Sequence, residues 1–276
     1  MALQAAKAAA FKALHEASGA FIIPNPWDTG TAKVLARLGF KALATTSAGF
    51  AFALGRPDGE GAIGRDETLE NARTIVEASE LPVSADLENG FGDAPEACAE
   101  TIRRAAETGL AGGSIEDATG RADNPIYPFA QALERVAAAV QAARALPHPF
   151  MLTARAENLI HGRPDLPDTI RRLVAFAEAG ADVLYAPGLK TKEDIAAVVR
   201  AVAPKPVNVL MGLAGAAFSL ADLAALGVKR ISVGSALARA AFGAFLRAAE
   251  EMKVKGTFDF AGQAASYAEL NKMFGG

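Results

Sequence analysis

Eight short runs of apolar and β-branched residues recur along the chain, and longer segments with helical periodicity separate them. The runs occupy residues 20–24, 42–46, 82–86, 112–116, 150–155, 182–186, 207–211 and 230–234. Helical patterns occupy residues 31–39, 66–79, 95–109, 168–180, 192–202 and 219–227. Strands that alternate with helices predict a parallel sheet. Eight such units in about 250 residues match a closed (β/α)8 TIM barrel, with a doubly wound sheet as the alternative.

No linker, low-complexity segment or charge block divides the chain, so we expect one barrel domain over residues 1–276. The first 18 residues have the pattern of an amphipathic helix and not of a signal peptide. A helical extension is expected over about residues 240–276. Its apolar side chains, more than an exposed tail needs, are Phe258, Phe260, Tyr267, Leu270 and Phe274. We expect them to pack on the barrel or on a neighbouring subunit.

Charge and cysteine content exclude several classes of function. The chain of 276 residues has 28 Lys and Arg against 31 Asp and Glu, a formal net charge of −3. This balance argues against a nucleic-acid partner and against a polybasic membrane patch. The single cysteine, Cys98, rules out an internal disulfide framework and a Cys-rich zinc site, which favours a reducing, cytoplasmic setting. No apolar run approaches the roughly 20 residues that a membrane span needs.

Four carboxylates follow the predicted strands at the end where barrel enzymes place their chemistry. Asp86 and Glu88 lie two residues apart on an extended segment, so their side chains face the same way. Glu116 ends the next strand, and Asp58 lies on the loop of the other neighbouring strand. Such a cluster needs a counter-charge, and a hard cation such as Mg²⁺ suits oxygen ligands. We therefore predict a metal site at these four residues.

Other strand-end residues are candidates for binding an anionic substrate. The planar guanidinium of Arg155 suits a carboxylate, although it could merely balance Glu157. Thr46 and Ser47 could bind a second anionic oxygen, and Asn208 on the seventh strand is a further candidate. The segment 90–92, Gly-Phe-Gly, would let the backbone come close to a ligand. Cys98 is expected to be a buried small side chain and not a nucleophile.

Four segments together resemble the isocitrate lyase / phosphoenolpyruvate mutase superfamily. They are NPWDTGTAKVLARLGFKALATTSAGFAFALGRPDG, PVSADLENGFG, SIED and LTARAE. The resemblance implies a (β/α)8 barrel, often with the last helix exchanged between subunits of dimers or tetramers. It implies Mg²⁺ or Mn²⁺ held through Asp86, with Asp58, Glu88 and Glu116 helping directly or through waters. It also implies that Arg155 binds a carboxylate of a 2-oxo acid, of its enol form or of an adduct that releases it.

The chain departs from that family at two places. Glu88 stands where the family usually has Asp. The loop after the fourth strand, EDATGRADNPIYP (116–128), lacks the K-[KR]-C-G-H motif of isocitrate and methylisocitrate lyases. Phosphonomutases use a Lys and an Asn in this loop, and only Asn124 has a counterpart here. A true isocitrate lyase is therefore not expected, and mutase activity is disfavoured.

The sequence favours a Mg²⁺-dependent lyase or decarboxylase that acts on a small 2-oxo acid or a related 2-hydroxy dicarboxylate through an enolate. The catalytic candidates are Arg155, Glu116 and Asn124, and Tyr127 is a candidate proton donor by elimination. The loop 117–128 is a candidate lid. Two alternatives stay open: a phosphonomutase or phosphonopyruvate hydrolase, and a non-catalytic protein that binds 2-oxo acids. A homodimer or homotetramer is expected.

Overall fold

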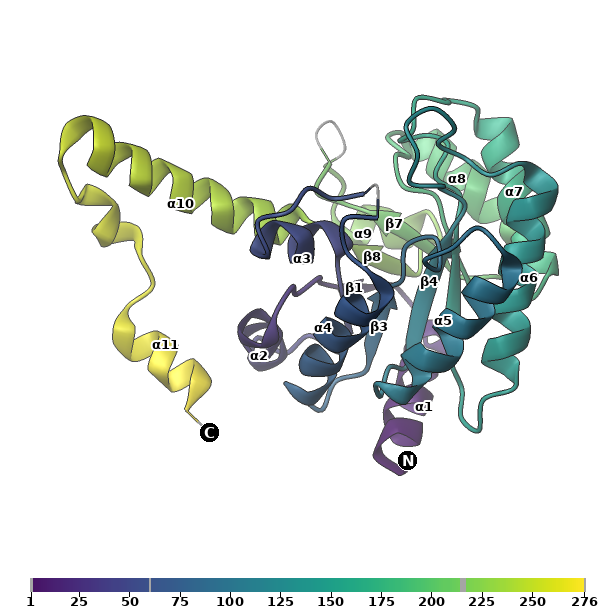
Figure 1. The fold of residues 1–276 in the computed structure, drawn as a ribbon, viewed down its shortest axis with the longest axis horizontal. Coiled ribbons are helices and arrows are strands. Elements are labelled where there is room, and N and C mark those ends of the chain that lie inside the picture. The colour runs from purple at the N-terminus through teal and green to yellow at the C-terminus, as the bar shows by residue number, and fades with distance from the viewer. Residues whose placement is uncertain (1, 60, 214–216, 276) are drawn as a thin grey trace.

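Eight parallel strands form a nearly closed barrel in the computed structural model, which describes residues 2–59, 61–213 and 217–275 (Figure 1). The strands are β1 (Phe21–Ile23), β2 (Leu43–Ala44), β3 (Val83–Asp86), β4 (Gly112–Glu116), β5 (Met151–Arg155), β6 (Val183–Tyr185), β7 (Val207–Leu210) and β8 (Arg230–Ser232). Their order is β1-β8-β7-β6-β5-β4-β3-β2, and every pair is parallel. The Ala44 N–H donates to the Pro24 carbonyl at 3.0 Å across the remaining seam. The predicted (β/α)8 barrel is confirmed, and the doubly wound alternative is wrong.

Helices cover the outside of the barrel between successive strands. They are α2 (Thr29–Arg37), α3 (Ser47–Ala53), α4 (Arg65–Glu77), α5 (Pro95–Glu107), α6 (Phe129–Arg144), α7 (Leu166–Glu178), α8 (Lys192–Val202) and α9 (Leu220–Ala225). The helices expected from the periodicity are present, with their ends shifted by a few residues. The short α3 lies in a segment that we expected to be a loop. It begins there because Thr46 caps it, accepting the Gly49 N–H at 3.2 Å on Oγ1.

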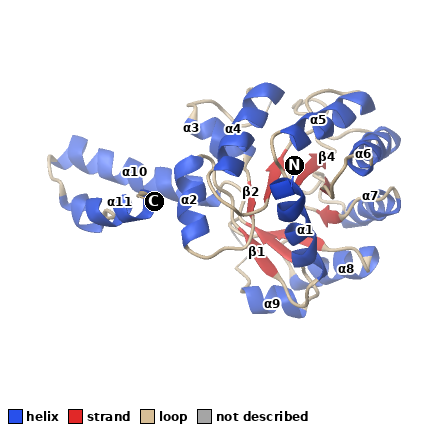
Figure 2. Cartoon of the chain, turned by 90° about the horizontal axis from the view of Figure 1, so that it is seen from below, coloured by secondary structure: helices blue, strands red, loops and turns tan. Residues whose placement is uncertain are grey.

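The N-terminal helix α1 (Ala2–Glu16) closes the barrel at the end opposite the functional strand ends (Figure 2). Phe11 is fully buried and packs in a cluster with apolar side chains in or next to several strands. Members of this cluster are Ala8, Phe11, Ile23, Ala42, Ala111, Met151 and Val183. The amphipathic helix expected here is therefore a plug of the barrel floor.

The C-terminal segment leaves the barrel as an arm. Helix α10 (Ala236–Lys255) extends away from α3, and a short 3-10 helix, η1 (Asp259–Gln263), turns the chain back (Figure 1). Helix α11 (Tyr267–Phe274) then returns to α2, where Arg37 donates to the carbonyls of Lys272 at 2.9 Å and Gly275 at 2.8 Å. The expected extension is thus helical, and its end packs on the chain's own barrel. None of the described helices is both long and apolar enough to cross a membrane.

Candidate active site

Arg155 lies at the centre of the acidic strand ends. It ends β5 directly opposite Glu116 of β4, and the two side chains form an ion pair at 3.0 Å. Its Nη1 lies 2.8 Å from Asp86 Oδ1 at the end of β3, and its Nε lies 2.8 Å from Glu157 Oε1. Burial lowers the pKa of Arg155, but the charges of Glu116, Glu157 and Asp86 outweigh burial and raise the pKa well above its usual value. Arg155 is therefore a fixed cation.

Two further carboxylates face this cluster without an ion pair in the described part of the chain. Burial and the neighbouring charge of Asp86 raise the pKa of Asp58, partly offset by a hydrogen bond from Ser47. Burial, Asp86 and Asp58 together raise the pKa of Glu88 to about 7. These shifts show that the cluster holds more negative charge than Arg155 neutralises.

Glu116 shows the same excess of negative charge. Burial raises its pKa well above the usual value, against the opposing effect of Arg155, and the charges of Glu157, Asp86 and Glu88 raise it further. A hard cation would relieve this repulsion, and oxygen atoms are the ligands that Mg²⁺ takes. No group of three His, Cys, Asp or Glu side chains among the described residues is arranged to hold an ion directly. Mg²⁺ usually binds through one or two carboxylates and keeps several waters, so the residues present suit it.

The segment after β2 positions part of the rim. The Thr45 hydroxyl accepts the Asp86 N–H at 2.9 Å, and the Ser47 N–H donates to Asp86 Oδ2 at 3.4 Å. Ser47 lines both cavities, and its role in substrate binding stays a prediction. Thr46 is buried and lines the inner cavity, but its hydroxyl is occupied by capping α3.

Two cavities that share the lining residues Ser47, Asp58 and Arg155 lie around the cluster. The outer cavity, about 1070 Å³, opens above the strand ends and is bounded by Asp58, Glu88, Glu116 and Arg155. The inner cavity, about 210 Å³, lies inside the barrel and reaches Asp58, Asp86 and Arg155 from below. Asn208 is fully buried and lines the inner cavity, where its Nδ2 donates to Ser232 Oγ at 2.9 Å. The structure thus brings together Asp58, Asp86, Glu88, Glu116, Arg155, Ser47 and Asn208 around these spaces.

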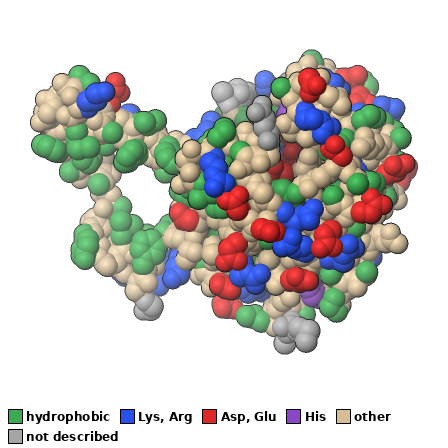
Figure 3. Space-filling model, viewed as in Figure 1, with side chains coloured by type: hydrophobic (Ala, Val, Ile, Leu, Met, Phe, Trp, Pro, Cys, Tyr) green, Lys and Arg blue, Asp and Glu red, His purple; other side chains and the backbone are tan. Residues whose placement is uncertain are grey.

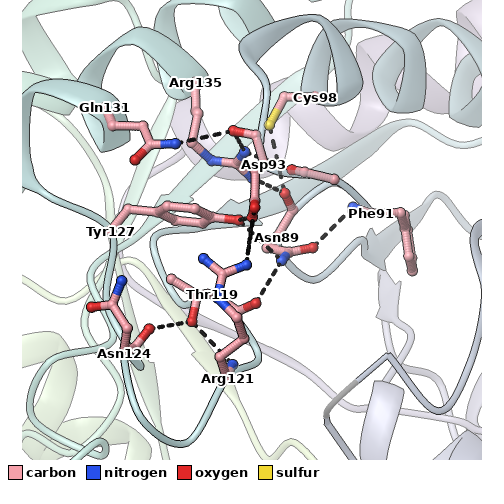
Figure 4. A network of polar contacts seen from close by, with 11 residues as sticks. Asn89, Phe91, Asp93, Cys98, Thr119, Arg121, Asn124, Tyr127, Gln131 and Arg135 are labelled. Carbon is pink, nitrogen blue, oxygen red and sulfur yellow. Dashed lines mark hydrogen bonds and ion pairs between the residues drawn. The ribbon is translucent and has the colours of Figure 1, made fainter.

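The loop 117–128 does not bring its two candidates to the cavities. Asn124 is exposed and lines neither cavity, and only its backbone carbonyl is engaged, by the Thr119 hydroxyl. The Tyr127 hydroxyl donates to Asp93, and the Arg135 guanidinium stacks on the Tyr127 ring at 4.1 Å (Figure 4). Burial and the Asp93 carboxylate raise the pKa of Tyr127 to about 12. Tyr127 is therefore a packing residue here, which corrects its assignment as proton donor.

The Gly-Phe-Gly segment packs closely on α5, and Phe91 and Gly92 also line the outer cavity. Gly90 has φ +78°, and a Cβ there would lie 2.8 Å from Cys98 Sγ and 3.0 Å from Cys98 Cα on α5. A Cβ at Gly92 would lie 2.8 Å from the Ala97 Cβ. Both glycines let the loop lie against α5. Cys98 itself is buried and free, as expected.

Sequence reasoning undervalued two buried groups. Glu157, considered only as a partner that could balance Arg155, is almost fully buried and contacts it directly. Arg230 on β8 was not considered at all, although it lines the inner cavity. Its place inside the barrel followed from its position at the start of β8, two residues before Ser232 and on the same side of an extended strand. That periodicity was the signal that could have identified it.

Comparison with known proteins identifies the family of this chain. The phosphoenolpyruvate phosphomutase family profile matches residues 11–253. The chain belongs to this family. The resemblance to the wider phosphoenolpyruvate mutase/isocitrate lyase superfamily is therefore confirmed, and with it membership of an enzyme superfamily that includes carbon–carbon lyases.

Three relatives show how far the similarity extends. A solved structure from Burkholderia cenocepacia that carries only the broad description lyase/mutase is 64% identical, with a TM-score of 0.97, and covers 100% of this chain and 98% of that chain. A solved 2,3-dimethylmalate lyase is 26% identical, with a TM-score of 0.85, over 99% of this chain and 94% of that chain. The oxaloacetate decarboxylase of Paraburkholderia xenovorans is 29% identical over 218 residues, 76% of this chain and 69% of the relative.

Proposed function

We propose that this chain is a Mg²⁺- or Mn²⁺-dependent lyase or decarboxylase that acts on a small 2-oxo acid or a related 2-hydroxy dicarboxylate. The observation that supports this most is that the strand ends carry more carboxylates than Arg155 can neutralise: Asp86, Glu116 and Glu157 pair with it, and Asp58 and Glu88 line the same cavities. Two relatives, a 2,3-dimethylmalate lyase and an oxaloacetate decarboxylase, carry names of this class of reaction.

The cation would be held by Asp86, with Asp58, Glu88 and Glu116 contributing directly or through waters. When bound, it supplies positive charge that stabilises negative charge developing on the substrate as a bond to carbon breaks. Arg155 binds a substrate carboxylate and adds a second fixed positive charge. Its contact with Glu157, whose carboxylate is 2% exposed, holds the guanidinium in place. Since neither Asn124 nor Tyr127 faces the cavities, we assign the returning proton to water.

The first test is proton NMR of the purified chain with Mg²⁺ and again with EDTA. The panel contains oxaloacetate, 2-methylisocitrate, 2,3-dimethylmalate and phosphonopyruvate. We expect metal-dependent pyruvate, or propionate with pyruvate, from one of the first three. Pyruvate from phosphonopyruvate alone would instead support phosphonate chemistry. Binding of a 2-oxo acid without turnover of any member would support a non-catalytic binding protein.

A variant series ties turnover to the carboxylate cluster. We expect Asp86→Ala to lower metal-dependent turnover by about 100-fold or more, because it removes both a metal ligand and a partner of Arg155. Asp123→Asn, an exposed residue of the loop 117–128, is the matched control and should keep wild-type turnover. Unchanged turnover in Asp86→Ala would exclude the proposed metal site.

We also propose that the arm formed by α10, η1 and α11 pairs with a second copy of this chain. Its exposed apolar side chains are Leu237, Phe242, Phe245, Leu246, Met252, Val254, Phe258, Tyr267, Leu270 and Phe274. Figure 3 shows hydrophobic side chains over much of this arm, which stands away from the barrel. An exposed apolar surface of this kind marks an interaction site. A second copy suits it because the surface is long and leaves the barrel where the last outer helix would pack.

A further inference from the structure

The inside of this barrel carries a polar layer where branched apolar side chains usually pack. One step below the strand ends, the inner cavity is lined by side chains that are each at most 8% exposed. We call them the inner polar layer: Ser84, Ser114, Asn208, Arg230 and Ser232. Polar groups buried in this way are unfavourable unless they meet hydrogen-bonding partners.

Arg230 is the charged member of this layer. Its Nε donates to Asn208 Oδ1 at 2.8 Å and its Nη2 donates to Thr153 Oγ1 at 3.0 Å. Its buried Nη1 has no acceptor among the described residues. Burial lowers the pKa of Arg230 to about 10, so the side chain stays protonated at neutral pH.

Two other arginines of the described chain, Arg155 and Arg172, are neutralised by carboxylates, whereas the buried Arg135 donates to the backbone carbonyls of Asn89, Gly92 and Asp93 and lines neither cavity. Arg155 contacts three carboxylates, and Arg172 pairs with Asp117 at 3.0 Å and Asp168 at 2.7 Å. Arg230 forms no ion pair in the part of the chain that the structure describes. A buried cation that contacts only neutral groups is strongly unfavourable, and an anion beside it would remove that penalty.

The inner cavity connects this cation to the metal-binding carboxylates. Asp58 and Asp86 line one end, and Arg230, Asn208 and Ser232 line the other. A molecule that fills it meets a cation-binding end near the mouth and a guanidinium deep in the barrel. A small compound with an anionic group at each end matches that arrangement.

We propose that Arg230, oriented by Asn208, binds the second carboxylate of a dianionic substrate inside the barrel. This inference rests on the proposed function, which places the 2-oxo end of the substrate at the carboxylate cluster. Arg230 is then the group that selects dicarboxylates over monocarboxylates of the same length.

Calorimetric titration of the whole chain with Mg²⁺ present tests this without turnover. Succinate and butanoate have the same carbon chain, and butanoate carries a methyl group in place of one carboxylate. We expect wild type to bind succinate about 10- to 100-fold more tightly than butanoate, because a charge-assisted hydrogen bond in a buried site is strong. Arg230→Met should abolish that preference and leave butanoate binding unchanged. Arg230→Lys should keep part of the preference for succinate. The surface control Arg103→Met should keep all of that preference.

A second measurement keeps the proposal testable if Arg230→Met does not fold. In ¹⁵N-arginine-labelled wild type, succinate should shift the Arg230 Nε–H resonance, and butanoate should not. Equal preference for succinate in a folded Arg230→Met, or no shift in wild type, would overturn the proposal. A shift caused equally by butanoate with chloride would assign the site to a free inorganic anion and also overturn it. If succinate preference depends on Arg230 while the NMR panel shows no turnover, the carboxylate site stands and the proposed reaction fails.

Discussion

At the scale of single residues, His15 on the barrel plug is the clearest case of a side chain fixed in one protonation state. Its Nδ1 lies 2.8 Å from the Phe11 carbonyl, and its Nε2 is buried without a partner in the described structure. The rings of Phe11 and Phe21 pack on the His15 ring in T-shaped geometry, with centroid distances of 4.7 and 5.1 Å. Burial and the charge of Arg230 lower the pKa of His15 to about 3. A proton on Nε2 would have no acceptor there.

This shift predicts how stability changes with pH. The folded pKa of His15 lies below its unfolded value of 6.5, so its stabilising contribution is complete above pH 6.5. The contribution falls as pH drops from 6.5 towards 3, by about 1.4 kcal/mol per pH unit. Urea unfolding at pH 7, 6 and 5 should therefore give a shallower decline for His15→Phe than for wild type. His148→Gln, in the loop before β5, serves as the control and should follow wild type. Parallel declines in wild type and His15→Phe would contradict the prediction.

Residue spacing predicted which side chains lie at the strand-end opening of the barrel, but not which contacts each side chain makes there. Asp86, Glu116 and Arg155 end neighbouring strands, and parallel strands bring their ends together whatever the packing details. Asn124 and Tyr127 lie on a loop, where the direction of a side chain depends on tertiary contacts. The partners Asp93 and Arg135 that hold Tyr127 are 34 and 8 residues away from it, and no local pattern announces those contacts.

At the scale of elements, the loop 117–128 is tied to the loop between β3 and α5. The bridge between Ala118 and Ile126 closes it into a hairpin. Asp93 holds it from outside by accepting from Arg121 at 2.9 Å and from the Tyr127 hydroxyl (Figure 4). Because Arg121, Asp93 and Gly120 border the outer cavity, these contacts hold one wall of the mouth.

Removing Asp93 should loosen that wall without unfolding the barrel. We expect Asp93→Ala to speed amide hydrogen exchange over residues 118–126 by releasing Arg121 and Tyr127 together. The free energy of unfolding should fall by less than about 2 kcal/mol, since the ion pair is about half exposed. Glu100→Gln removes a surface partner of Arg103 on α5 and is the matched control. Exchange in this loop that is as slow as in wild type would show that other contacts hold it.

At the scale of the whole molecule, the sequence predicted the barrel but not the path of the C-terminal arm. The alternation of strand and helix patterns indicates a parallel sheet, and eight βα units are the number that the (β/α)8 barrel uses. The path of α10 depends on the surface that its apolar face packs against. The sequence pattern shows that this face is apolar but not what it contacts. The expected exchange of the last helix between subunits therefore stays a prediction.

The arm gives that prediction a direct test. Phe245 and Leu246 are 67% and 64% exposed on α10, so replacing both with Asp should disrupt a self-associated form. Size-exclusion chromatography with light scattering should give a dimer or tetramer for wild type and a lower mass for the double variant. Replacing Lys253 and Lys255, at the polar end of the same helix, with Gln should leave the mass unchanged. A wild-type monomer at micromolar concentration would contradict the proposal.

The plug formed by α1 affects how a ligand enters and leaves the barrel. Phe11 and its neighbours fill the barrel floor, so among the described residues the inner cavity faces the strand-end side. The part of a ligand that enters first lies deepest in the inner cavity, and it leaves last. If a bond of the bound substrate is broken there, the fragment nearer the strand ends leaves before the fragment beside Arg230. The shape of the inner cavity then sets the order of product release.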